Sequence, residues 1–176
     1  MSVQRLAGIP GFAIDAVAAA AGNDPEILRL ENLDTDLSPP STVEAVTRAA
    51  IGRDENNSYL PFTGSLALRA AVAQHLSQQT GHSYDPESEV VITCGGTEGI
   101  FDALLATTDP GDEVIVTDPT YAGMINRVRL AGAVPKFVPF RRQGHEWRLD
   151  LQALQAAVSP RTRVLFIMNP SMPSGA

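Results

Sequence analysis

The sequence of 176 residues contains a single lysine, Lys136, and a single cysteine, Cys94. With one cysteine no disulfide can form within the chain, which is typical of proteins in a reducing compartment. The apolar stretch from Ala13 to Ala21 is too short to cross a bilayer and is interrupted by Asp15. The N-terminus also lacks the basic and then apolar order of a signal peptide. These absences predict a cytoplasmic protein without a membrane span.

The charge balance excludes further classes. The formal net charge of −7 is spread along the chain, which argues against non-specific binding to nucleic acids or anionic membranes. The three histidines are scattered, so no metal site is predicted. No Gly-x-Ser-x-Gly nucleophile motif occurs. A hydrophobic content of 44% is enough for a folded core.

Short apolar segments alternate with helical ones in the second half of the chain. The expected strands are 90–94, 113–117, 134–139 and 163–168, and the expected helices are 97–107, 121–131 and 150–158, the last one capped by Asp150. This alternation predicts an α/β fold with a mainly parallel sheet that has helices on both faces. Upstream, helices are expected within 10–21, from a cap at Ser41 or Thr42 to about 51, and from 66 to about 80. Because a turn follows the last strand, we expect the fold to continue beyond residue 176.

The segment Gly95-Gly96-Thr97 lies between an expected strand and an expected helix. A helix N-terminus offers free N–H groups and a positive dipole end, and two glycines let a ligand approach closely. The segment therefore predicts a phosphate-binding loop, with a tight turn capped by Thr97 as the alternative. Glu98 is interpreted as a capping charge, and Cys94 as a small buried residue at a strand end.

Three further segments are candidates for the same site. Tyr121 follows the next strand, so its ring is expected at the same edge of the sheet, where it could stack on a flat ligand. Tyr59 lies in a polar loop from which its hydroxyl could reach a phosphate, and Asn169 begins a proline-rich turn after the last strand. The alternatives are a tyrosine in the core or at a helix start, a loop-packing tyrosine and a plain exit turn. Arg69 is interpreted as a surface or ion-pair residue.

Taken in order, these segments resemble the class I/II aminotransferases of the fold-type-I pyridoxal-phosphate enzymes. Four motifs carry the resemblance: Tyr59-Leu60-Pro61 with Gly64, Leu68 and Arg69; Ile92 to Glu98; Asp112 to Val116 with Pro119 and Tyr121; and Asn169 to Gly175. The resemblance extends from about residue 28 to the end and matches roughly the first half of a family member. It implies an incomplete three-layer αβα large domain of the aspartate-aminotransferase type at 53–176. An N-terminal arm and a small-domain segment would occupy 1–52.

The resemblance also implies roles for individual residues. The loop from Gly95 would hold the phosphate of pyridoxal 5'-phosphate through the amides of Gly96 and Thr97, and Tyr121 would stack on the pyridine ring. Tyr59 would reach the cofactor phosphate of a neighbouring subunit, which implies a homodimer with shared active sites. The substrates would be an amino acid and a 2-oxo acid.

The chain departs from the family pattern at two positions. Met172 stands where the family has an asparagine that binds the cofactor ring, although Asn169 lies three residues earlier. Leu33 stands where a substrate-facing glycine is usual. The family's ring-binding aspartate, Schiff-base lysine and carboxylate-binding arginine would all lie beyond residue 176. No catalytic residue is therefore assigned, and this chain alone is expected to be inactive.

Two other functions fit the same residues. Altered contacts around the cofactor ring would suit a lyase, decarboxylase or oxidase of the same fold. The missing lysine would suit a non-catalytic module that senses a ligand or binds a partner. An isolated chain is also expected to self-associate, because its last strand would leave an open hydrophobic sheet edge.

Overall fold

The computed structural model describes residues 6, 8–9, 13–31 and 37–176. The described backbone separates into two compact units. One, here called the sheet unit, contains Thr93–Ala176 together with the described residues of the first eleven positions. The other, here called the helical unit, lies within 12–92. Each unit is described by itself, and the domain boundary expected after residue 52 remains a prediction. Leu33 and residues 10–12 of the expected N-terminal helix lie outside the described residues.

The helical unit contains the helices α1 (Ile14–Ala21), α2 (Ser41–Ile51) and α3 (Leu66–Thr80) and the short 3-10 helix η2 (Asp54–Asn57). Helix α2 begins at Ser41 directly after Pro40, because proline cannot continue a preceding helix but suits a helix start. The cap expected from Ser41 or Thr42 is not formed, since Pro40 is the N-cap residue and no side chain caps the helix. Helix α3 ends at Gly81, whose left-handed backbone (φ +73°) allows its N–H to bond the carbonyl of Ser77.

The strand expected at 90–94 is not formed, and this prediction is wrong. The segment is extended but irregular, and the amide of Ile92 donates one hydrogen bond of 3.0 Å to the carbonyl of Thr63. A strand is defined by a ladder of bonds to a neighbour, which an apolar run alone does not supply. Gly64 packs tightly here, since a Cβ added to it would lie 2.6 Å from the Cβ of Ile92.

The sheet unit alternates helices and strands in the expected order. It contains α4 (Gly96–Thr107), β1 (Glu113–Asp118), α5 (Ala122–Leu130), β2 (Val134–Gln143), β3 (Glu146–Leu149), α6 (Leu151–Ala157) and β4 (Thr162–Leu165). The strand order is β3-β2-β1-β4, in which β1 is parallel to both β2 and β4. The mainly parallel sheet is therefore confirmed. The predicted cap of α6 is confirmed as well, because the carboxylate of Asp150 accepts a hydrogen bond of 2.9 Å from the amide of Ala153.

The sequence prediction missed one hairpin. Strand β2 runs four residues beyond its expected end at 139, to Gln143, and pairs with the antiparallel strand β3. The turn between them is made by Gly144, whose positive φ of +62° suits a tight reversal. Strand β4, in contrast, ends earlier than expected, although the amide of Phe166 still bonds the carbonyl of Ile115.

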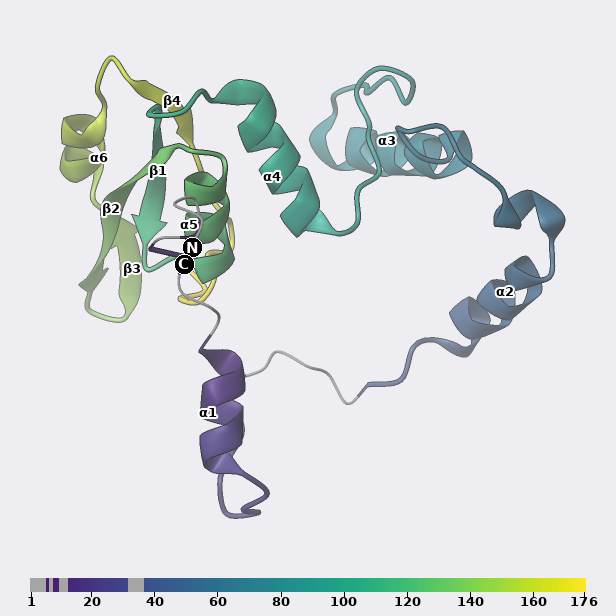
Figure 1. The fold of residues 1–176 in the computed structure, drawn as a ribbon, viewed down its shortest axis with the longest axis horizontal. Coiled ribbons are helices and arrows are strands. Elements are labelled where there is room, and N and C mark those ends of the chain that lie inside the picture. The colour runs from purple at the N-terminus through teal and green to yellow at the C-terminus, as the bar shows by residue number, and fades with distance from the viewer. Residues whose placement is uncertain (1–5, 7, 10–12, 32–36) are drawn as a thin grey trace. The chain divides into compact units, whose positions relative to one another are not determined.

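Helices cover both faces of the sheet, which gives three layers. Figure 1 shows α4 and α5 on one side of the strands and α6 on the other. The core under α4 and α5 consists of Leu104, Val114, Val116, Met124, Val128 and Ala133. Alternate residues of a strand point to opposite faces, so Ile115, which is also buried, belongs to the face of α6. The incomplete αβα arrangement predicted from the sequence is confirmed.

Candidate functional site

Three of the predicted site segments lie at one edge of the sheet. Because β1 and β4 are parallel, Tyr121 and Asn169, which follow them, lie beyond the same carboxyl edge. Helix α4 joins β1 through the short turn at 108–112 and so runs in the opposite direction, which places its first turn, with Gly96, at that edge too (Figure 1). Open parallel sheets bind their ligands beyond this edge.

The first turn of α4 leaves backbone N–H groups without helical acceptors. Gly95 is the N-cap residue, with φ +80° and ψ 165°, and no side chain caps the helix there. The amides of Gly96 and Thr97 follow in the first turn, where no preceding helical carbonyl exists. A Cβ added to Gly95 or Gly96 would meet no heavy atom within 4 Å beyond its chain neighbours. The backbone is therefore open to a ligand at this point.

The surroundings of this loop correct two predictions. Thr97 lies inside the helix, so the alternative in which it is the N-cap is wrong. Cys94 is exposed and not buried, because no strand forms around it. Glu98 lies in the first turn of α4, and its carboxylate accepts a hydrogen bond from the amide of Cys94, the residue before the N-cap, so its role as a capping charge stays a prediction. The hydroxyl of Thr93 donates to the carbonyl of Gly95 at 3.0 Å and holds the loop from the other side.

Tyr121 is the N-cap residue of α5. Its backbone is fixed by the helix start, because its carbonyl accepts a hydrogen bond of 2.9 Å from the amide of Met124. The aromatic ring is half-buried and lies over Gly123: a Cβ added to Gly123 would be 2.3 Å from the Cε1 atom of the ring. The ring therefore occupies the space that any side chain at position 123 would need.

The turn after β4 folds back on itself. The amide of Ser171 donates to the carbonyl of Ala176 at 2.7 Å, and the amide of Gly175 donates to the carbonyl of Ser171 at 2.6 Å. Asn169 is exposed, whereas Ser171 is buried, and its hydroxyl has no hydrogen-bond partner within the described residues. Ser171 was not singled out from the sequence, since a serine in a proline-rich turn carries no distinguishing signal. Met172 is half-buried beside it.

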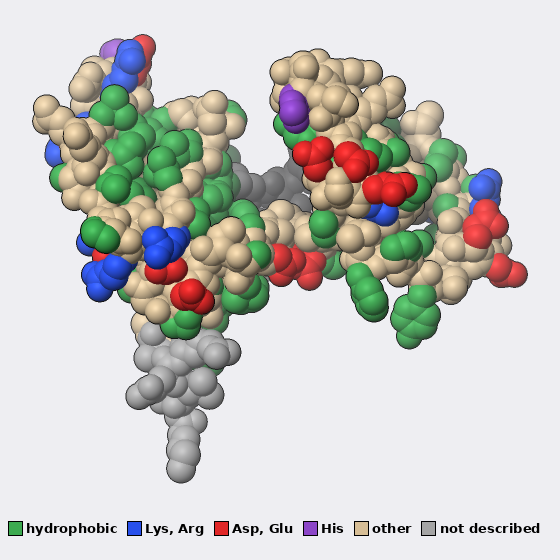
Figure 2. All heavy atoms as spheres, turned by 90° about the horizontal axis from the view of Figure 1, so that it is seen from above, with side chains coloured by type: hydrophobic (Ala, Val, Ile, Leu, Met, Phe, Trp, Pro, Cys, Tyr) green, Lys and Arg blue, Asp and Glu red, His purple; other side chains and the backbone are tan. Residues whose placement is uncertain are grey.

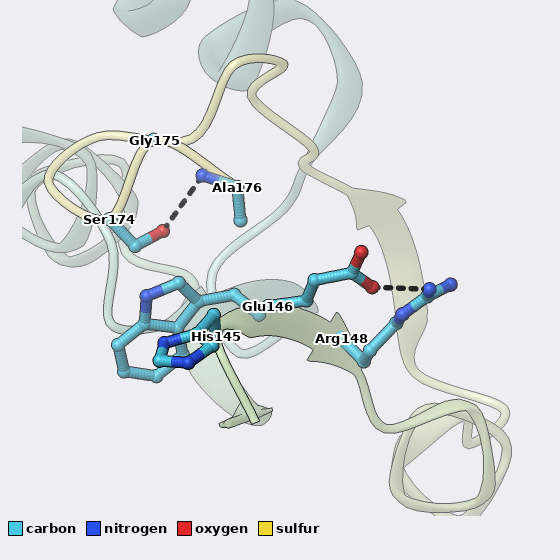
Figure 3. Close-up of a pocket in the computed structure, with 7 residues that line it drawn as sticks. His145, Glu146, Arg148, Ser174, Gly175 and Ala176 are labelled. Carbon is cyan, nitrogen blue, oxygen red and sulfur yellow. Dashed lines mark hydrogen bonds and ion pairs between the residues drawn. The ribbon is translucent and has the colours of Figure 1, made fainter. Parts of the chain in front are cut away.

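A shallow pocket lies between this turn and the β2–β3 hairpin. It is lined by His145, Glu146, Trp147, Arg148 and the final residues Ser174–Ala176 (Figure 3). Inside it Arg148 pairs with Glu146, and the amide of Ala176 donates to the hydroxyl of Ser174 at 3.3 Å. Two pairs of the pocket's polar groups thus bond each other.

Tyr59 belongs to the helical unit, where its side chain is fully exposed on the loop before α3. Phe62, three residues later, is equally exposed. Neither side chain packs into the core of its own unit. The alternative interpretation of Tyr59 as a loop-packing tyrosine is therefore wrong.

Arg69 on α3 is buried, with 6% of its surface exposed, and the surface interpretation of this residue is wrong. Its guanidinium donates to the carbonyls of Gly64 at 3.3 Å, Pro86 at 2.5 Å and Glu87 at 3.4 Å. A planar guanidinium with five N–H groups suits several carbonyls at once. Arg69 therefore links Gly64, at the end of the loop that contains Tyr59, to the segment after α3.

The single lysine is not part of the loop at the carboxyl edge. Lys136 lies on β2 opposite Ile115, and its charge contributes to lowering the pKa of Glu113, at the amino end of β1. The larger contribution to this lowered pKa is the hydrogen bond that the Ser159 hydroxyl donates to the carboxylate at 2.6 Å. Lys136 thus takes part in the electrostatics of the opposite end of the strand.

Two kinds of site do not occur in the part of the chain that the structure describes. No helix there is long and apolar enough to cross a membrane. No group of three or more histidine, cysteine, aspartate or glutamate side chains among the described residues is arranged to hold a metal ion.

Comparisons with known proteins agree with this geometry. The profile of the family "Aminotransferase class I and II" matches residues 29–176. A probable N-succinyldiaminopimelate aminotransferase of Mycobacterium tuberculosis is 41% identical over 138 residues, which cover 78% of this chain and 34% of the relative. A probable N-acetyl-LL-diaminopimelate aminotransferase of Bacillus subtilis is 34% identical over 151 residues, which cover 85% of this chain and 37% of the relative.

Solved structures give the same result. The structure of N-succinyldiaminopimelate aminotransferase from Mycobacterium tuberculosis matches all of this chain and 45% of its own chain, with a TM-score of 0.90 and 35% identity. An aspartate aminotransferase of Thermus thermophilus matches all of this chain and 46% of its own, with a TM-score of 0.86 and 28% identity. The chain belongs to the class I and II aminotransferase family. It spans about a third of the length of the curated relatives described above.

Proposed function

We propose that the protein carrying this chain is a pyridoxal-phosphate-dependent aminotransferase that transfers an amino group between an amino acid and a 2-oxo acid. The observation that carries the proposal is the open first turn of α4 at Gly95-Gly96-Thr97, at the same sheet edge as the ring of Tyr121. The relatives are named for several different amino-acid substrates, so the proposal is for the reaction class.

The residues present fit pyridoxal 5'-phosphate. A phosphate needs several N–H donors and a positive potential, which the amides of Gly96 and Thr97 and the dipole of the twelve-residue helix α4 supply. A flat aromatic ring such as Tyr121 suits the face of a pyridine ring. Asn169 and the unpartnered hydroxyl of Ser171 are further polar groups in the turn after β4, which follows the same edge. When bound, the cofactor supplies an electron sink that stabilises negative charge on the substrate's alpha carbon.

Each residue of this chain then has a limited task. Gly95 shapes the loop, and the amides of Gly96 and Thr97 hold and orient the phosphate. Tyr121 fixes the plane of the ring and excludes water from one face. None of these groups moves a proton to or from carbon. Because Lys136 belongs to the amino end of the strands, we assign the catalytic lysine to the part of the relatives' length that this chain does not span.

The assembly we propose is a homodimer with shared sites, in the cytoplasm. The full exposure of Tyr59 supports the shared site, since an exposed hydroxyl is available to a neighbouring subunit. Such a subunit would receive a hydrogen-bond donor for its phosphate. Sedimentation of the complete protein tests this point: a monomer at all concentrations, with full cofactor binding, would contradict the shared site.

Met172 favours one second candidate. A half-buried thioether in the turn after β4 gives no strong hydrogen-bond donor where an amide is usual in the family. Different contacts to the cofactor ring would suit a lyase, decarboxylase or oxidase of the same fold. Product analysis separates the two, because these reactions release a fragment, carbon dioxide or reduced oxygen in place of an aminated 2-oxo acid.

The deciding experiment uses the complete protein freed of cofactor. Pyridoxal 5'-phosphate is titrated in and followed by protein fluorescence, and amino-group transfer from ¹⁵N-labelled amino acids to a 2-oxo acid is followed by mass spectrometry. We expect saturable binding and a labelled amino-acid product. Absence of binding would contradict the proposal altogether, and binding without label transfer would replace it by the second candidate.

A further inference from the structure

We propose that Gly123 is a positioning residue, which lets the ring of Tyr121 lie over the first turn of α5 and so sets the ring's place at the carboxyl edge. The inference rests on the proposed function, in which this ring stacks on the cofactor. Gly123 has this role because it has no side chain. A Cβ at position 123 would lie 2.3 Å from Cε1, 2.5 Å from Cζ and 2.7 Å from the hydroxyl oxygen of Tyr121.

The backbone gives no other reason for glycine at this position. Gly123 lies inside α5 and is not among the glycines with positive φ. Glycine is the poorest helix former after proline, so local structure alone would favour alanine. Gly123 is also buried, so a side chain there would have no route into solvent. The space that glycine leaves is taken by Tyr121.

Other glycines at which an added Cβ would meet a neighbour differ from Gly123 in backbone conformation or in the closeness of the contact. Gly64 also meets a neighbour at less than 3.0 Å, but its φ of +91° already requires glycine. Gly99 in α4 would meet the hydroxyl of Thr93 at 3.1 Å, a milder contact. Among the described glycines, Gly123 alone combines an ordinary helical backbone with a clash against a side chain. The ring of Tyr121, and not the backbone, therefore requires glycine at position 123.

The clash would be relieved by the ring and not by the helix. The atoms that a Cβ would meet form the far end of the Tyr121 side chain, which rotates about two torsions. The backbone of Tyr121 is held by the bond from Met124. The carbonyl of Gly123 also accepts a bond of 3.3 Å from Arg127. Gly123→Ala should thus keep the fold and turn the ring away from its position at the edge.

The first test measures cofactor binding in the complete protein. We expect Gly123→Ala to raise the Kd for pyridoxal 5'-phosphate about tenfold, which equals about 1.4 kcal/mol, and to change the circular dichroism of the bound cofactor. Gly52→Ala is the matched control, because Gly52 has an ordinary φ of −80° and open space around its Cβ position. It should bind as the unchanged protein does.

A double-mutant cycle separates positioning from general packing. In a Tyr121→Ala background no ring is left to displace, so Gly123→Ala should cause no further loss of binding. An equal loss in both backgrounds would overturn the inference, because the effect would then not pass through the ring. Binding by Gly123→Ala equal to that of the unchanged protein would overturn it as well.

A second readout needs no cofactor. Nitration of Tyr121 by tetranitromethane, followed by peptide mass spectrometry, reports how accessible the ring is in the ligand-free protein. We expect several-fold faster nitration of Tyr121 in Gly123→Ala and an unchanged rate at Tyr84, which packs edge-on against His82. An unchanged rate at Tyr121 would overturn the inference even if the protein binds the cofactor. A faster rate without any cofactor binding would retain the positioning role and contradict the proposed function.

Discussion

Glu113 and Arg161 join the beginnings of two adjacent parallel strands by two bonds at once. The guanidinium of Arg161 lies 2.8 Å from the Glu113 carboxylate, and the amide of Glu113 donates to the carbonyl of Arg161 at 2.8 Å. The Glu113 side chain is only 3% exposed, whereas that of Arg161 is 73% exposed. A buried carboxylate is stable only when it is well bonded, and here Arg161 and the Ser159 hydroxyl bond it, so the group links the amino ends of β1 and β4.

The first prediction concerns pH. The hydrogen bond from Ser159, and after it that from Arg161, lowers the pKa of Glu113 below its ordinary value of 4.5. A lowered folded-state pKa means that the stabilisation is fully present above about pH 4.5 and is lost as the pH falls through the lower, folded-state value. We therefore expect urea midpoints of the protein to fall below pH 4.5, and to fall less steeply in Glu113→Gln. Glu55→Gln, which removes an exposed carboxylate, is the control and should retain the full slope. Equal slopes in all three proteins would contradict the prediction.

The second prediction concerns Arg69. Arg69→Ala would leave three backbone carbonyls without their charged donor, so we expect a loss of about 2–4 kcal/mol in the free energy of unfolding. Arg48→Ala is the matched control on α2: its side chain is 76% exposed and pairs with Glu44, so it should cost under about 0.5 kcal/mol. Urea unfolding measures both. Similar small losses would show that Arg69 does not hold the loop before α3.

The third prediction separates two neighbouring glycines. Gly95→Ala should destabilise the fold by about 1–3 kcal/mol, because the φ of +80° and ψ of 165° at this position strain any other residue. Gly96 has an ordinary helical backbone, so Gly96→Ala should leave the melting temperature nearly unchanged while its methyl group narrows the approach to the amides. We expect at least a tenfold weaker Kd for pyridoxal 5'-phosphate in Gly96→Ala, with Gly52→Ala unaffected. Full-strength binding by Gly96→Ala would remove this loop from the proposed site.

The elements that the sequence predicted well are those bounded by their own local chemistry. Helix α2 follows Pro40, α3 precedes Gly81, and α6 begins at the cap Asp150. Strand β1 was found because its continuous apolar run matches burial on both faces. In each case residues close in sequence decide the structure, so the sequence pattern is enough.

The errors come from residues whose environment is made by distant parts of the chain. The run at 90–94 is apolar enough for a strand but forms no ladder, and Cys94 is exposed as a result. Arg69 is buried because carbonyls up to eighteen positions away surround it, which no local pattern reveals. The hairpin at Gly144 did have a local signal, a glycine between two polar β segments, which the prediction did not use. Likewise, that Gly123 makes room for Tyr121 depends on the direction of the ring, and the sequence does not give this direction.

The fourth prediction concerns the start of α6. Asp150 caps the helix through the amide of Ala153 and pairs with Arg141 at 2.5 Å, and these two bonds lower its pKa in that order. Asp150→Asn keeps an oxygen acceptor for the cap and loses the charge, whereas Asp150→Ala loses both. We expect the melting temperature to fall in both variants and by clearly more in Asp150→Ala. Equal losses would show that the ion pair, and not the cap, carries the stabilisation.

The fifth prediction concerns the face of β4. Val164 packs against the core under α4 and α5, so Leu165, the next residue of β4, points to the other face. Leu165 is 46% exposed, and Ile167, two residues beyond it, is 54% exposed. Helix α6 packs mainly on β2. Figure 2 shows hydrophobic side chains gathered at the surface of the sheet unit. An exposed apolar strand at a sheet edge is a template for association with a second chain.

We therefore expect the chain of 176 residues, expressed alone, to self-associate. The double variant Leu165→Lys/Ile167→Lys should shift it toward the monomer, because two charges on this face oppose burial against another copy. Val46→Lys on α2 is the control: Val46 is more exposed, at 70%, but belongs to a helix and not to a strand, so a lysine there should have little effect on association. Sedimentation velocity over a range of concentrations gives the distribution of species. If Val46→Lys reduced association as much as the double variant, the cause would be surface charge in general. If none of the chains associated, the apolar face of β4 would not be an interaction surface in the isolated chain.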